Sequence, residues 1–247
     1  MATKYLVLDT ETAGNTEKAS VYDLAWSVTD DNGATYVERR YIISEIWNDN
    51  PLMQNAYYER KIASKYQPLI EDGTLPVVPL QTARLQMLYD MITYGVTCVY
   101  AFNATFDHGA LDNTVKTLSN GYVTSFLPET VEWRCIMGFA QDIICCTEDY
   151  VSWCIKHRFL TDNGNPVGSA EVLYRYISRD THFVESHTAL DDVRIESEIM
   201  RYALKHSGIK VGSWRGGSRW RKMRDIKNAI AASKNTLAAC GGCHFSR

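Results

Sequence analysis

The sequence predicts an α/β protein in which helices pack on a mixed β-sheet. Apolar segments of strand length occur at residues 5–8, 21–29, 35–43 and 97–102. An Asn-Gly pair at 32–33 favours a tight turn between the second and third segments, which indicates a hairpin. Other stretches repeat their apolar residues at helical spacing. The order strand, hairpin, helix, strand, helix and further helices is typical of a mixed sheet with helices packed on it.

The segments between these strands differ in how clearly they predict structure. Residues 45–79 contain four prolines and are expected to be irregular or loosely helical, whereas residues 121–168 follow no clear pattern. Apolar periodicity or capping residues predict the helices. They are expected over 80–94, 103–116, 169–177 with Ser169 as N-cap, 189–205, and about 219–234. Four glycines within 208–217 indicate a linker before the last helix.

Length and composition fit one domain of ordinary size with an appendage. The chain has 247 residues, 45% hydrophobic and 22% charged, which is ordinary for a globular protein. It has no run of 18 apolar residues, so we expect no membrane span. The N-terminus lacks the features of a signal peptide. We therefore expect a cytoplasmic, or at least intracellular, protein whose cysteines are reduced thiols.

Charge is distributed unevenly along the chain. Residues 205–247 carry a net charge of +9 and the rest −12, although the total is only −3. This asymmetry suggests an acidic cation-binding body joined to a basic arm that contacts nucleic acid or another acidic partner. The alternative is a solvated extension or a basic amphipathic helix docked on the acidic body. The basic arm interleaves aromatic and cationic residues, as base stacking and phosphate binding require: Trp214, Arg215, Arg219, Trp220, Arg221, Lys222 and Arg224.

Asp9 and Glu11 form the first candidate site. Residues i and i+2 of a strand face the same side, so both carboxylates project together at the end of an apolar strand. Two adjacent carboxylates repel each other and raise each other's pKa unless a cation lies between them. Mg²⁺ and Mn²⁺ prefer such oxygen ligands. Taken alone, the pair is equally consistent with a solvated strand end.

Two further motifs place acids near helix starts. Asp107 lies early in the helix that follows the strand at 97–102. Thr188 and Asp191 match a capping box, in which Asp191 has a structural role and Asp192 is free to point elsewhere. His187 precedes this helix on a loop and, through the cap, can turn towards the same site as Asp192. Each motif alone is more often structural.

Together these motifs resemble the three motifs of DEDD exonucleases, in the branch with a histidine. This branch includes polymerase proofreading subunits, ribonuclease T and oligoribonuclease. The matching segments are Asp9-Thr10-Glu11-Thr12 with Gly14, Asn103-Ala104-Thr105-Phe106-Asp107, and His187-Thr188-Ala189-Leu190-Asp191-Asp192. They appear in the family's order, and the spacing of five between His187 and Asp192 fits the branch. The longer segments 44–79 and 121–168 and the basic arm are not explained by the resemblance.

The resemblance implies an RNase H-like fold with a five-stranded mixed sheet, and 3′→5′ hydrolysis of single-stranded nucleic acid by two divalent cations, Mg²⁺ or Mn²⁺. It implies that Asp9, Glu11, Asp107 and Asp192 hold the cations and that His187 is the general base. Thr12, Asn103 and Phe106 are implied to contact the substrate. The implied division is a catalytic domain over 1–207 and a basic extension over 208–247.

Several alternatives remain open at this stage. Single-stranded DNA is the leading substrate, either for a free-standing enzyme or for one that proofreads beside a polymerase or another replication partner. An exoribonuclease would carry the same motifs, and a catalytically dead nucleic-acid-binding module is the alternative outside the enzymes. Cys240, Cys243 and His244 match a haem-attachment pattern, or half of a zinc site, but free thiols are expected.

Overall fold

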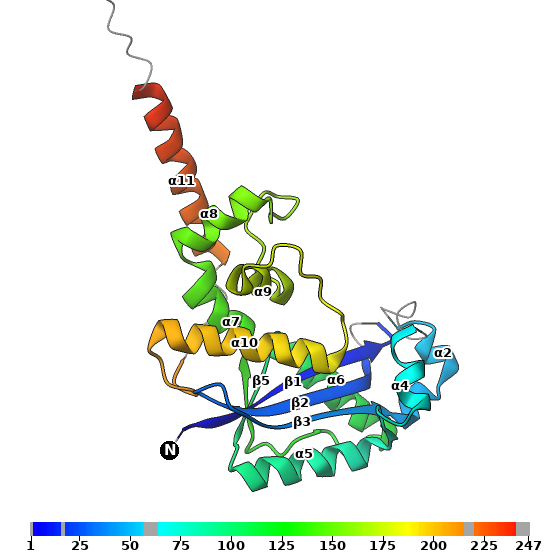
Figure 1. Cartoon of the computed structure of the whole chain (residues 1–247). Helices are drawn as coiled ribbons and strands as arrows, with labels where there is room; N and C mark the ends of the chain where they lie inside the picture. Colours follow the sequence, from blue (N-terminus) through cyan, green and yellow to red (C-terminus); the bar gives the residue numbers. More distant parts are fainter. Residues whose placement is uncertain (1, 16–17, 57–63, 215–219, 241–247) are drawn as a thin grey trace, which may run out of the picture.

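A central six-stranded mixed sheet organises the molecule (Figure 1). The computed structural model describes residues 2–15, 18–56, 64–214 and 220–240, with the side chains of Trp220 and 233–240 excepted. The strands are β1 (Lys4–Ala13), β2 (Ser20–Asp30), β3 (Thr35–Ile43), β4 (Val77–Val78), β5 (Cys98–Ala101) and β6 (Glu132–Cys135), in the spatial order β4-β3-β2-β1-β5-β6. β1, β2 and β3 pair antiparallel, as the hairpin prediction requires, and the other pairings are parallel.

The predicted count of five strands is wrong by one. The additional strand β4 has two residues and pairs with the end of β3, where Ile42 donates a backbone hydrogen bond to Pro76. Pro76 and Pro79 flank β4, and a pair of valines between prolines gives no readable alternation. A strand so short can form only at the edge of a sheet that is already in place.

Helices cover both faces of the sheet. They are α1 (Ser44–Trp47), α2 (Asn50–Met53), α4 (Gln67–Glu71), α5 (Leu80–Tyr94), α6 (Ala104–Leu118), α7 (Ile136–Ala140), the π-helical turn η1 (Gln141–Cys145), α8 (Glu148–His157), α9 (Ala170–Ser178), α10 (Ala189–Ser207) and α11 (Trp220–Cys240). The five predicted helices are confirmed, including the Ser169 cap of α9. The short elements β6 to α8 had no sequence prediction.

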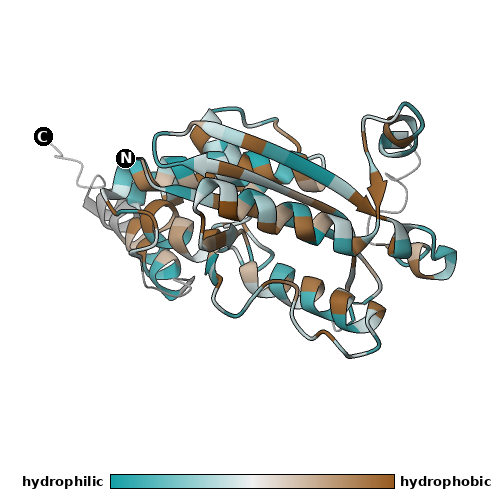
Figure 2. Ribbon diagram, turned by 90° about the horizontal axis from the view of Figure 1, so that it is seen from below, coloured by the Kyte–Doolittle hydropathy of each residue, from teal (hydrophilic) through white to brown (hydrophobic). Residues whose placement is uncertain are grey.

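The sheet separates two hydrophobic clusters. Leu6 and Leu8 face the cluster that includes α5 and α6, whereas Tyr5 and Val7 face the cluster that includes α7 to α10. Because β1 is buried on both faces, its apolar run is continuous rather than alternating. Figure 2 shows hydrophobic and hydrophilic residues sharing the same helices, as expected for elements with one face on the core. By the same alternation, Asp9 follows Val7 on the α10 side.

Asp23 fastens α10 to the sheet. This fully buried residue of β2 accepts hydrogen bonds from Arg40 Nη2 at 2.8 Å, from the Tyr66 hydroxyl at 2.8 Å and from the backbone N–H of Ala189 at 3.2 Å. Ala189 is the first residue of α10. The contact therefore fixes the start of that helix, and the residues one turn along it, against the centre of the sheet.

We expect Arg40→Ala to destabilise the protein by about 3–5 kcal/mol, because removing one partner of a buried ion pair leaves the other charge unpaired. Arg194→Ala is the matched control. Its pair with Glu38 is exposed, with 53% of the arginine side chain accessible, and such pairs contribute about 0–1 kcal/mol. Urea unfolding of both variants measures the difference. Equal losses of stability in the two variants would show that burying the Asp23 charge does not depend on its pairing with Arg40.

Candidate metal centre

Asp9, Glu11 and Asp192 form a compact carboxylate group. Asp9 and Glu11 come from β1 and Asp192 from the first turn of α10, and one oxygen of each lies within 4.8 Å of the others. Asp9 is partly exposed, whereas Glu11 and Asp192 are buried. Three oxygen ligands from two rigid elements are a donor set that a hard divalent cation can use. No other group of three or more His, Cys, Asp or Glu side chains among the described residues has its ligand atoms this close together.

Asp9 of β1 and Asp192 of α10 both have raised pKa values. Burial raises the pKa of Asp9 well above its usual range, and the charges of Glu196, Asp107, Asp192 and Glu11 raise it further. Burial also raises the pKa of Asp192 to about 8, with added repulsion from Glu185. Asp192 Oδ1 is buried without a hydrogen-bond partner among the described residues. An unpaired buried oxygen of this kind is where a cation would be stabilising.

Asp107 lies beside the compact group and is not part of it. It occupies the first turn of α6, and its Oδ1 accepts a 2.8 Å hydrogen bond from the hydroxyl of Thr10 in β1. Burial raises its pKa to about 7, although that hydrogen bond acts in the opposite direction. The charge of Asp107 raises the pKa of Asp9, although its oxygens lie outside the 4.8 Å group.

The loop before α10 holds His187 in a left-handed backbone conformation with a φ of 52°. Residues other than glycine rarely adopt this conformation, and such strain concentrates at functional sites. Lys65 Nζ donates to the carbonyl of Ser186 at 2.6 Å and holds the loop from outside. His187 Nδ1 lies 3.7 Å from Glu185 Oε2. This carboxylate can orient the imidazole and favour a proton on Nδ1.

The predicted capping box at the start of α10 is wrong. Thr188 is the N-cap residue, but its side chain accepts no hydrogen bond from the helix. Its hydroxyl instead donates to Asp191 Oδ2 at 3.0 Å, and Ser186 Oγ donates to the same oxygen at 2.7 Å. The Thr188 hydroxyl is thus bonded to the Asp191 carboxylate instead of to a backbone N–H of the helix. Asp191 nevertheless stabilises the loop and points away from the metal centre towards Arg194.

The three predicted substrate contacts differ in exposure. Thr12 is half-buried and follows Glu11 at an irregularity in the β1–β2 register, a distortion that can redirect a side chain beside a site. Asn103 is exposed at the N-cap of α6. Phe106 is partly buried against the first cluster. Their contact with substrate stays a prediction.

Three residues near the site were missed by sequence reasoning: Lys65, Glu185 and Glu196. Glu196 is 3% exposed, one helical turn after Asp192. Its position in the apolar stripe of α10, between Val193 and Ile199, could have revealed it, because acids on that stripe are buried. Lys65 and Glu185 lie on irregular segments whose sequence gives no such periodicity.

The basic C-terminal arm is divided between docked and exposed residues. The Trp214 ring centroid lies 5.6 Å from that of Phe139, and Trp214 Nε1 donates to Asp142 Oδ2 at 3.2 Å. Met223 of α11 is buried in the second cluster. The predicted linker is therefore packed on the domain over its described part, and Trp214 is occupied by these contacts. Exposed cations remain at Arg221, Lys222 and Arg224, whereas Arg215, Arg219, Cys243 and His244 lie outside the described residues.

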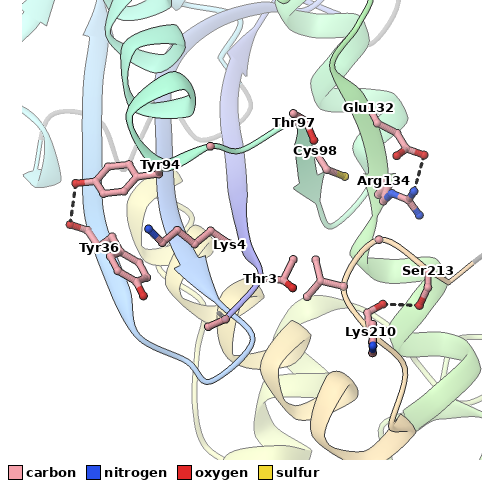
Figure 3. A pocket seen from close by; sticks show the side chains of 14 residues that line it. Thr3, Lys4, Tyr36, Tyr94, Thr97, Cys98, Glu132, Arg134, Lys210 and Ser213 are labelled. Carbon is pink, nitrogen blue, oxygen red and sulfur yellow. Dashed lines mark hydrogen bonds and ion pairs between the residues drawn. The ribbon is translucent and has the colours of Figure 1, made fainter.

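A separate hollow lies at the start of β1. Its volume is about 940 Å³. Figure 3 shows its lining, in which Lys4 lies near Tyr36 and Tyr94 and Arg134 forms part of the wall. Asp9 is five residues further along β1, roughly 17 Å away at the usual rise of a strand. The hollow contains Glu132 but no carboxylate cluster, so the metal centre is a separate feature.

Solved structures with a similar fold are nucleases. Cell-death related nuclease 4 (CRN-4) aligns with a TM-score of 0.52 and 12% identity over 83% of this chain and 64% of its own. E. coli exonuclease I bound to a dA16 oligonucleotide gives 0.53 and 12% over 96% and 45%, and its dT13 complex gives 0.55 and 11% over 83% and 42%. The predicted RNase H-like α/β fold is thereby confirmed. The chain spans less than two thirds of each of these proteins.

No protein-family model and no curated protein matches the sequence. At 11–12% identity, the structural likeness establishes the fold alone. In the part of the chain that the structure describes, no helix is both long and apolar enough to cross a membrane. The intracellular location stays a prediction.

We expect the metal-free protein to lose stability as pH rises from about 4 to about 8. The raised carboxyl pKa values mean that the folded chain keeps protons that the unfolded chain has already released, so rising pH favours unfolding in this window. Melting temperatures in chelator should fall, and the increase produced by Mg²⁺ or Mn²⁺ should grow with pH. Asp192→Asn should flatten the metal-free profile. A metal-free melting temperature that rises across this window would contradict the argument.

Substitutions at the neighbouring positions 221 to 223 test whether the arm contacts nucleic acid or only packs on the domain. Arg221→Ala combined with Lys222→Ala should leave stability within about 0.5 kcal/mol, because both side chains are exposed. If both contact phosphates, the slope of log affinity against log salt should fall by about 1.4. Met223→Ala should cost about 2–5 kcal/mol and leave that slope unchanged. An unchanged slope in the double variant would make the arm purely structural.

Proposed function

We propose that the protein is a metal-dependent 3′→5′ exonuclease that releases nucleoside monophosphates from the 3′ ends of single-stranded DNA. The observation that carries this proposal is the convergence of Asp9, Glu11 and Asp192 oxygens within 4.8 Å at a buried site. The motif order and the fold shared with nucleases support the reaction class. The oligonucleotides in the exonuclease I structures support single-stranded DNA as the substrate.

The carboxylates divide into two sets of cation ligands. Asp9, Glu11 and Asp192 would hold one cation, and Asp107 together with Asp9 would hold the second. When bound, such ions lower the pKa of a water and stabilise the negative charge on the leaving 3′ oxygen. Because Glu11 and Asp192 are buried, water would screen their charges less and their attraction for a cation would be stronger. The fold provides the positioning through β1, α6 and α10.

His187 would accept the proton of the attacking water. Its near-neutral intrinsic pKa suits a group that must be neutral before the reaction and charged after it. Glu185 beside Nδ1 would stabilise the imidazolium and leave Nε2 to face the water. The left-handed backbone at His187 and the Lys65 contact to Ser186 would hold the ring at the mouth of the site.

Substrate contacts would come from residues around the metal centre. Thr12, Asn103 and Phe106 would position the terminal nucleotide, with Phe106 offering a ring for stacking. The catalytic unit would comprise residues 1–207. The extension over 208–247 would add phosphate contacts through exposed cations while its apolar side remains docked.

Incubation with end-labelled DNA and RNA oligonucleotides of matched sequence tests the proposal. We expect DNA shortened stepwise from its 3′ end in Mg²⁺ or Mn²⁺, with no shortening in excess chelator. Asp192→Asn should remove nearly all activity, because one of three ligands of the compact group is lost. Asp191→Asn, the adjacent acid outside that group, should retain the rate and lose about 0.5–1.5 kcal/mol for each disrupted hydrogen bond.

Three outcomes would overturn parts of this proposal. Full activity in chelator would exclude the metal mechanism. Shortening of RNA but not DNA would assign the same site to an exoribonuclease. If Asp191→Asn were inactive and Asp192→Asn active, the assignment of the helix acid would be reversed.

A further inference from the structure

Glu196 is a buried acid that the two predicted ligand sets do not use. It lies one turn after Asp192 on the face of α10 that packs on the sheet, and it is 3% exposed. A carboxylate in such a position is unfavourable unless it is paired with donors or a cation. Phe102, directly after β5, donates its backbone N–H to the Glu196 carboxylate. The second oxygen, Oε2, is buried and has no hydrogen-bond partner in the described part of the chain.

Negative charges from three elements surround this side chain. The charge that acts most strongly on Asp9 is that of Glu196. In turn, the leading charges that act on Glu196 are those of Asp107 and Asp192, followed by Glu185. Its position one turn after Asp192, buried on the side of α10 that packs on the sheet, places Glu196 beside these carboxylates, and the charge interactions with Asp9 and Asp107 agree with that placement. Glu196 is not part of the compact group around Glu11.

The two cation sites are unequal without this residue. The compact group offers three carboxylates, whereas the second site has Asp107 and a shared Asp9. One oxygen of Asp107 is already engaged by the hydroxyl of Thr10. The second site is thus poor in ligands, whereas Oε2 of Glu196 is buried and has no hydrogen-bond partner among the described residues.

We propose that Glu196 supplies a third carboxylate to the second cation through a bound water. This inference rests on the proposed function and adds a ligand to the same site. Its consequence is that the second cation binds before substrate arrives, because the protein alone provides enough negative oxygens. With only Asp9 and Asp107, that ion would depend on substrate phosphate to complete its shell.

The alternative is a purely structural role, in which a protonated Glu196 donates a hydrogen bond within the carboxylate cluster. Glu196→Gln separates the two roles. Glutamine has the shape and the donor of a protonated glutamic acid but lacks its negative charge. It therefore preserves a structural hydrogen bond and removes a metal ligand of full charge.

The test is a calorimetric titration of the full-length, substrate-free chain with Mn²⁺. Wild type should bind two ions, and Glu196→Gln should weaken one of them by about 10–100-fold while the other is unchanged. Glu198→Gln is the matched control, since the same substitution two residues away removes a side chain that is 45% exposed and paired with Arg201. It should bind both ions as wild type does. In chelator, Glu196→Gln should melt no lower than wild type.

Each other result counts against the proposal. Two ions bound by Glu196→Gln with wild-type affinity would leave the residue structural, as would a wild type that binds only one ion without substrate. If Glu196→Gln does not fold, Glu196→Leu is measured in the same way, because leucine fills the space without charge. Failure of wild type to bind Mn²⁺ or shorten oligonucleotides overturns the proposed function itself. Metal-dependent hydrolysis with unchanged binding in Glu196→Gln overturns only the role of Glu196.

Discussion

Mutual repulsion among buried carboxylates is the constraint on which the arrangement of this fold depends. Acids from three elements converge beside the centre of the sheet, and each raises the pKa of its neighbours or has its own pKa raised by burial. Left free, such side chains would move apart into water. They stay together because β1 is buried on both faces, α6 is tied to β1 through Thr10, and α10 is tied to β2 through Asp23.

The contact that anchors α10 to β2 is made by an acid outside the carboxylate group. Asp23 is also fully buried, but it is neutralised by Arg40 and bonded by Tyr66, so its charge is satisfied. Asp192 Oδ1 and Glu196 Oε2 have no such partner in the described residues. The same protein therefore treats buried acids in two ways. Paired acids hold elements together, and unpaired acids leave binding capacity for an ion.

Local patterns in the sequence predicted the parts of the site that depend on one element at a time. The i, i+2 spacing of Asp9 and Glu11 needs only a strand, and the position of Asp107 needs only a strand followed by a helix. Glu196 could be recognised only from its position in the apolar stripe of α10 and not from its residue type, because a glutamate in an amphipathic helix is usually solvated. The predicted Thr188 cap was wrong because Thr188 forms a local hydrogen-bond network with Asp191 and Ser186. This network competes with the helix amides for the Thr188 hydroxyl.

Most of the secondary structure was also predictable from the sequence, except where an element or a contact depends on packing against distant residues. The long strands and helices follow from periodicity, but β4 exists only through its pairing with β3, and the π-helical turn η1 interrupts the helical region after β6. Docking of Trp214 depends on Gly138, where an added Cβ would lie 2.9 Å from the indole. A glycine that admits a tryptophan 76 positions away leaves no trace in either local sequence.

The phase of α10 explains why one of two adjacent aspartates joins the compact carboxylate group. Consecutive residues of a helix are about 100° apart, so Asp191 and Asp192 cannot face the same way. Asp191 turns outward to Arg194 with its side chain 49% exposed, whereas Asp192 is 7% exposed. One turn further along the inward side lies Glu196. The apolar stripe of α10 faces the sheet, so acids on the same side of the helix face the sheet as well. The orientation of α10 about its own axis therefore determines both the core packing and the position of these acids.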